Sequence, residues 1–90
     1  MITINLPSQL RTFTNGQKAV KVQAATFGEA IHRLDDISPM IRPQVFDATG
    51  AIRRFVGVFV NNEQVAEMEQ SAEPIADGST ITIVMAVAGG

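Results

Sequence analysis

The sequence contains no cysteine, few charged residues and no long apolar run. The absence of cysteine excludes disulfide bonds, thiolate zinc sites and thiol nucleophiles. No run of about 18 apolar residues occurs, and no charged leader opens the chain, so we expect a cytoplasmic protein that does not span a membrane. Lysine and arginine total 7 against 9 acidic residues, a net charge of −2. Nucleic acid is therefore not an expected partner, because its binders carry a positive field.

The chain is also short. Its 90 residues make one domain, since single cores extend to roughly 100–150 residues. A composition of 46% hydrophobic and 18% charged residues is typical of a folded globule. A domain of this size has little room for a deep cleft. We therefore expect a protein that is not itself an enzyme.

The first third of the chain predicts a wide hairpin. Apolar and polar residues alternate over 2–6 and again over 20–24, the pattern of strands with one buried face. Asn15-Gly16 is a strong turn signal between them. Residues 8–14 are expected to form a loop on the way to this turn.

A helix is expected after the hairpin. Thr26 stands three residues before Glu29, the spacing of a capping box. The apolar residues that follow form one stripe at helical spacing: Phe27, Ala30, Ile31 and Leu34. The helix should end near Ile37, ahead of a proline. Residues 38–51 are expected to be irregular, with a short helical turn at 40–46.

Three further strands are predicted in the second half. They cover 54–60, the short edge segment 64–65, and 80–88 after the turn signal Asp77-Gly78. A hairpin, one helix and three strands predict an α+β roll with the first and last strands parallel at its centre. This is the β-grasp, or ubiquitin-like, arrangement, with a mixed sheet of four to five strands and one main helix across one face.

The chain ends in Gly89-Gly90. A terminal pair of this kind is often only a frayed end. Here, however, it directly follows the strand that closes the predicted sheet, so we expect a domain over 1–86 and a flexible reactive tail over 87–90. An extended chain from Val87 through Ala88 to Gly90 spans about 13 Å and can carry the α-carboxylate into a partner's channel. Glycines let such a channel close tightly around the backbone.

The carboxylate of Gly90 is the one group in this chain with an evident reactive role. A carboxylate becomes electrophilic only when its oxygen is made a leaving group, and adenylation by ATP achieves this. Attack by sulfur then leaves a terminal thiocarboxylate. Since the chain has no cysteine, carried sulfur cannot sit on a side chain, which leaves the terminus. His32 is the only histidine, and no metal site is expected.

Three segments carry a family resemblance. They read INLPSQLRTFTNGQKAV, RFVGVFVNNEQV and IADGSTITIVMAVAGG. Over its whole length the sequence resembles the small ubiquitin-like sulfur carriers, which include the small subunit of molybdopterin synthase, the thiazole-synthesis carrier and the carrier used in cysteine biosynthesis. It is most similar to the cysteine-synthesis branch, in which the opening loop, the Val-Asn turn and the AVAGG end have the same placement.

The resemblance implies a cycle with several partners. An E1-like enzyme that uses ATP would adenylate Gly90, and a sulfur source would convert it to the thiocarboxylate. A PLP-dependent cysteine synthase would use this sulfur on an activated serine, and a protease such as a metalloprotease would release the cysteine. The carrier itself would bind no cofactor and catalyse nothing.

A docking face is predicted from strand alternation. Since Gly57 offers no side chain to the core, we expect Val56, Val58 and Val60 to point inward and Phe59 outward. The same alternation places Ile81 and Ile83 inward on the last strand. The expected patch beside the tail contains Phe59, Val84, Thr82 and Phe55. The alternative is that Phe59 belongs to the core, as phenylalanines often do.

Other functions fit the same residues. A protein modifier would join the adenylated Gly90 to a target lysine, and a non-reactive interaction domain would make no use of the glycine pair. The arginines in loops and at the strand start can meet acidic partner surfaces, although exposed arginines usually contribute little: Arg11, Arg42, Arg53 and Arg54.

Overall fold

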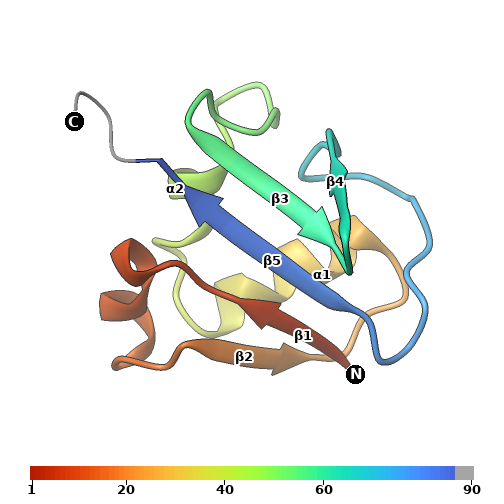
Figure 1. The fold of residues 1–90 in the computed structure, drawn as a ribbon, viewed down its shortest axis with the longest axis horizontal. Helices are drawn as coiled ribbons and strands as arrows, with labels where there is room; N and C mark the ends of the chain where they lie inside the picture. Colours follow the sequence, from red (N-terminus) through yellow and green to blue (C-terminus); the bar gives the residue numbers. More distant parts are fainter. Residues whose placement is uncertain (87–90) are drawn as a thin grey trace.

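The protein is described from a computed structural model that covers residues 1–86 (Figure 1). Its elements are, in chain order, β1 Ile2–Asn5, η1 Ser8–Thr14, β2 Ala19–Val22, α1 Phe27–Arg33, η2 Leu34–Asp36, α2 Arg42–Val45, β3 Val56–Val60, β4 Glu63–Val65 and β5 Thr80–Met85. The η segments are 3-10 helices.

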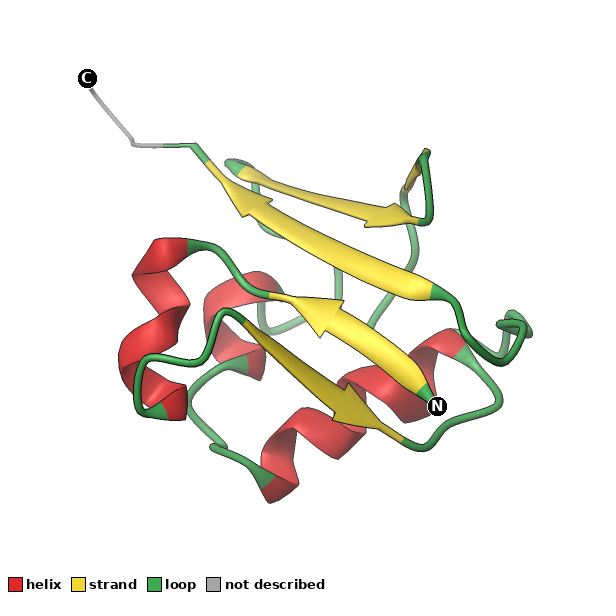
Figure 2. Cartoon of the chain, turned by 60° about the horizontal axis from the view of Figure 1, so that its bottom comes forward, coloured by secondary structure: helices red, strands yellow, loops and turns green. Residues whose placement is uncertain are grey.

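The predicted β-grasp sheet is confirmed. Five strands lie in the order β2-β1-β5-β3-β4, and β1 runs parallel to β5 while the other pairs are antiparallel. The first and last strands are thus neighbours near the centre of the sheet. Figure 2 shows α1 below the sheet, covering one of its faces.

Strand alternation puts one face of the sheet against α1. Ile4, Val58 and Ile81 have fully buried side chains, and all belong to the same hydrophobic core as Phe27 and Ile31 of α1. Phe27 also meets Phe46 edge to face, with ring centroids 6.4 Å apart. The inward orientation predicted for the valines of β3 is therefore confirmed.

The start of α1 follows the predicted capping box. The Glu29 amide donates to Thr26 Oγ1 at 3.1 Å, as the motif requires. The Glu29 carboxylate accepts at 3.0 Å from the amide of Ala25, one residue before the N-cap residue that would donate in a standard capping box. The first two amides of the helix, those of Phe27 and Gly28, donate to the carbonyl oxygens of Glu73 and Ser71 at 2.9 Å each. The loop before β5 thus satisfies amides that a helix start leaves without partners.

The loop predicted over residues 8–14 is a 3-10 helix instead. Leu10 is buried in the core, and Thr14 Oγ1 lies 3.1 and 2.9 Å from the carbonyl oxygens of Arg11 and Gln17. A single buried leucine does not produce a periodic pattern, which is why the sequence did not indicate a helix. The turn at Asn15-Gly16 has the left-handed φ values, 56° and 85°, that this residue pair favours.

Residues 38–51 contribute more to the core than their irregular sequence suggests. The short helical turn is present as α2, and the segment buries Ile41, Val45 and Phe46. The flanking strands differ slightly from expectation. β3 begins at Val56 rather than at residue 54, and β5 ends at Met85 rather than continuing to 88. Residues 87 and 88 lie outside the part that the structure describes.

Candidate functional site

The base of the tail is held by the fold. Met85 ends β5, pairs with Val56 of β3, and accepts a hydrogen bond from Gln9 Nε2 at 3.4 Å through its carbonyl. The amide of Ala86 donates to the carbonyl of Phe55 at 2.8 Å. The central strand therefore delivers the chain to a defined point between the start of β3 and η1. The predicted reactive residues, Val87, Ala88, Gly89 and Gly90, lie outside the described residues.

The outer face of β3 and β5 carries the predicted patch. Phe59 pairs with Thr82 across the two strands, and Val84 pairs with Gly57. Val84 is 44% exposed and Phe55 is 53% exposed, while Phe59 and Thr82 are partly exposed. Phe59 is not among the residues of the hydrophobic core or those packed against it. Its outward orientation is thus confirmed, whereas its role in docking stays a prediction.

Gly57 has a packing reason that the sequence did not reveal. A Cβ atom built there would lie 3.0 Å from Val84 Cγ2 and 3.7 Å from Phe59 Cε1. Gln64 Nε2 would lie 3.6 Å from the same Cβ atom. Side chains from β3, β4 and β5 therefore approach the bare backbone of Gly57, and Val84 and Phe59 are the apolar ones among them.

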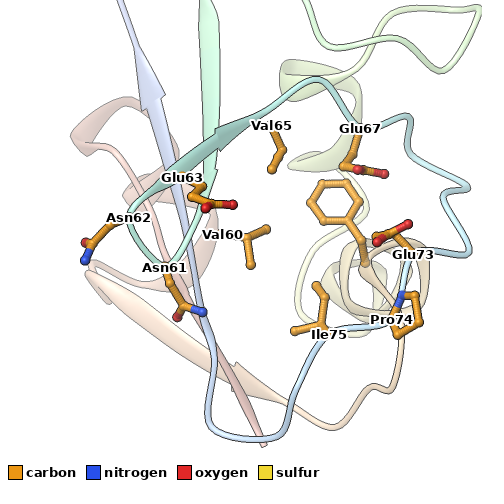
Figure 3. Close-up of a pocket in the computed structure, with 10 residues that line it drawn as sticks. Val60, Asn61, Asn62, Glu63, Val65, Glu67, Glu73, Pro74 and Ile75 are labelled. Atoms are coloured by element: carbon orange, nitrogen blue, oxygen red, sulfur yellow. The ribbon is translucent and has the colours of Figure 1, made fainter.

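A hollow of about 620 Å³ lies at the other end of the strand pair (Figure 3). Val60, Val65 and Ile75 contribute its apolar lining, and Glu67 and Glu73 contribute carboxylates. It adjoins the end of β3, opposite the end at which Met85 pairs with Val56. Since six residues of β5 separate the two ends, about 17–20 Å, the hollow is remote from the base of the tail.

Arg42 is a structural residue that the sequence did not identify. Its guanidinium contacts Asp35 at 2.9 Å and Glu69 at 3.0 Å, which joins η2, α2 and the loop before β5. Hydrogen bonding to Asp35 is the main cause that raises the pKa of Arg42, against the opposing effect of burial. The interpretation of Arg42 as a solvated surface arginine was therefore wrong. Asp35 lies seven residues before Arg42 on another element and Glu69 lies 27 residues after it, so no helical or strand spacing marks the two pairs.

Residues 1–86 show neither a metal-binding cluster nor a membrane-spanning helix. In this part of the chain, no group of three or more His, Asp or Glu side chains is arranged to hold a metal ion. No helix in it is both long enough and apolar enough to cross a bilayer.

The mixed five-stranded sheet with α1 across one face defines a ubiquitin-like domain of the β-grasp class. Among solved structures, CysO in the BexX/CysO complex of Amycolatopsis orientalis matches all of both chains with a TM-score of 0.85 at 34% identity. CysO of Mycobacterium tuberculosis matches 97% of this chain and 100% of its own with a TM-score of 0.84 at 36% identity. The SAMP1 structure from Haloferax volcanii has a TM-score of 0.78 at 26% identity over 99% and 98% of the two chains.

The protein belongs to the ThiS family, whose model matches residues 4–90. It is 38% identical to the sulfur carrier protein CysO of Mycobacterium tuberculosis strain H37Rv, over 99% of this chain and 98% of that protein. The predicted resemblance to the ubiquitin-like sulfur carriers is thereby confirmed. The chain is a homologue of a sulfur carrier, and the family implies sulfur donation from a thiocarboxylate.

Proposed function

We propose that the α-carboxylate of Gly90 is the group on which this carrier holds and donates sulfur. The carboxylate oxygen of Gly90 attacks the α-phosphate of ATP on an E1-like enzyme, and pyrophosphate leaves. Hydrosulfide then attacks the acyl carbon, AMP leaves, and the chain ends in a thiocarboxylate; with a persulfide donor the product is an acyl disulfide, which a thiol reductant cleaves to the same thiocarboxylate. The observation that carries this proposal is the position of Gly89-Gly90 soon after the central strand β5, in a chain similar to CysO throughout.

The fold would contribute position rather than chemistry. The hydrogen bonds of Gln9 to Met85 and of Ala86 to Phe55 hold the start of the tail beside the apolar face. From Val87 onward, about 13 Å of extended backbone is enough to reach a partner's active site. In this proposal the protein is a co-substrate, and the enzyme that receives the tail supplies the catalytic groups.

For the recipient we propose a PLP-dependent cysteine synthase, followed by a protease such as a metalloprotease that releases cysteine and restores Gly90. The similarity to CysO supports this branch. The complex of BexX with CysO gives an example of a similar carrier bound to a partner. ATP would belong to the activating enzyme and PLP to the recipient, with no cofactor held by the carrier. We expect this chemistry in the cytoplasm, where ATP is available.

Intact-mass measurement tests the proposal. The carrier is incubated with its activating enzyme, ATP and a sulfide or persulfide donor, and we expect the mass change of one oxygen-for-sulfur exchange. Deletion of Gly90 should abolish this change and leave the melting temperature unaltered, because the hydrophobic core that the structure describes is formed by residues between Ile2 and Met85. Full pathway activity of the deletion variant would overturn the proposal.

A second candidate function is protein modification through the same adenylate. The structural similarity to SAMP1 of Haloferax volcanii, whose name is small archaeal modifier protein 1, supports this second function. If the activated carrier is instead joined to lysines, the reaction would give conjugates of higher mass and no sulfur exchange. The mass measurement thus separates the two functions.

A further inference from the structure

A second surface feature adjoins the base of the tail and consists of Arg53, Arg54 and Phe55, which we term the basic shoulder. These residues directly precede β3. They border a hollow of about 480 Å³ whose wall also includes Met85 and Ala86, the last described residues of the chain. Figure 1 shows the start of β3 beside the end of β5, at the same end of this antiparallel strand pair. An enzyme that takes up the tail must therefore pass close to the basic shoulder.

The contacts of the basic shoulder leave its charge available. Arg53 donates through Nε to the Pro43 carbonyl at 2.8 Å, and the Arg54 guanidinium carbon lies 5.8 Å from the centre of the Phe55 ring. Both arginines are exposed, and within residues 1–86 neither forms an ion pair with a carboxylate. The arginine stacked on Phe55 presents a cation and an apolar ring at one point.

The neighbouring charges favour one kind of partner. No acidic side chain lines the hollow beside the basic shoulder, and its remaining wall residues, such as Gln44, are uncharged. Asp47 and Glu69 line a neighbouring hollow that shares Arg53 with this one, whereas Arg54 lines only the hollow beside the base of the tail. Arg54 is thus the charge that faces an incoming molecule, in a protein whose net charge is −2.

We propose that the basic shoulder binds an acidic segment of the activating enzyme at the entrance to the site that receives the tail. This inference rests on the proposed function and names the chemistry of the partner's surface. On the carrier, the positive basic shoulder precedes the negatively charged carboxylate of the terminus. On the activating enzyme, an acidic rim would meet the basic shoulder, and a positively charged or phosphate-binding interior would receive the carboxylate. Such alternation sets the direction of docking and accelerates encounter. Phe55 supplies the apolar anchor inside the charged contact.

The test compares two charge reversals in the full chain. Arg54→Glu alters the basic shoulder, and Lys21→Glu makes the same change in net charge on β2, at the opposite edge of the sheet. Thiocarboxylate formation is measured with the activating enzyme that charges the unmodified carrier. We expect Arg54→Glu to raise KM for the carrier about tenfold at low salt with kcat within about twofold. Lys21→Glu should leave both within about twofold.

Salt provides a readout that a fold defect would not reproduce. The KM difference caused by Arg54→Glu should shrink at high ionic strength, where charges are screened over a few ångströms. The melting temperature should match that of Lys21→Glu. Equal KM values for the two variants, or a defect that salt does not change, would overturn the inference. Failure of the unmodified carrier to be charged would instead count against the proposed function, so the two failures are distinguishable.

Discussion

At the scale of single residues, the loop between α2 and β3 depends on one carboxylate. Asp47 Oδ1 accepts hydrogen bonds from the amide and hydroxyl of Thr49, at 2.9 and 2.6 Å, and from the amide of Ala51 at 3.2 Å. The hydrogen bond from the Thr49 hydroxyl is the largest cause that lowers the pKa of Asp47 below its ordinary 3.8. Asp47 thus replaces backbone partners in a segment without regular structure.

The first prediction concerns pH. A carboxyl group whose folded pKa is lowered stabilises the fold above its unfolded pKa and loses this effect as pH falls through the folded pKa. Asp47→Asn should therefore lower the urea midpoint near neutral pH, and the difference from the unmodified protein should shrink below pH 3.8. Glu63→Gln is the control, because Glu63 is exposed and forms no side-chain bond within residues 1–86. A difference independent of pH would contradict this account.

At the scale of elements, α1 and the loop before β5 come into direct backbone contact at Gly28. A Cβ atom at Gly28 would lie 2.6 Å from the Ser71 carbonyl oxygen. The same oxygen accepts the Gly28 amide at 2.9 Å. Gly28 does not have a positive φ, so its backbone conformation does not require glycine. Glycine is required because the helix and the loop backbone are in contact there.

The second prediction follows from this contact. Gly28→Ala should destabilise the protein by about 1–3 kcal/mol, because backbone must shift to admit the methyl group. In an open helix the same change would stabilise by up to about 1 kcal/mol, so the sign of the effect is diagnostic. Chemical denaturation measures it. Glu29→Ala is a poor control because it removes the capping bond, whereas His32→Ala, at an exposed position of the same helix, is suitable.

At the scale of the whole molecule, the sheet has two faces with separate tasks. One face packs against α1 and holds the core. The other presents Phe59 and Val84 over Gly57, next to the strand end from which the tail departs. Because the apolar patch and the base of the tail belong to the same pair of strands, docking at the patch would place the tail in a constant direction.

The third prediction separates docking from stability. Phe59→Ala should lower kcat/KM for adenylation about tenfold, the effect of losing a moderate interface anchor. It should cost only about 1 kcal/mol of stability, since the ring is outside the core. Ile81→Ala, on the buried face of the adjacent strand, should cost about 2–5 kcal/mol. A loss of stability at Phe59 as large as that at Ile81 would show that the ring is a structural residue.

Periodicity and turn chemistry were sufficient to determine most of the fold. Alternation over 2–6, the capping box at Thr26 and the turn at Asn15-Gly16 each depend on neighbours within a few residues, and each is confirmed. The same local rules placed Phe59 and Val84 on the outer face. The sequence by itself also excluded a cysteine persulfide as the form in which sulfur is carried, because the chain has no cysteine.

Only the tertiary structure decided the contacts between distant segments. Arg42 meets Glu69 across 27 positions, Gly28 meets Ser71, and the shoulder residue Phe55 holds Ala86. None of these pairs has a local signature, because they arise from how the loop before β5 and the start of β3 pack on the rest of the domain. A sequence pattern records which face of an element is apolar, whereas the partner of each side chain depends on how the elements assemble in three dimensions.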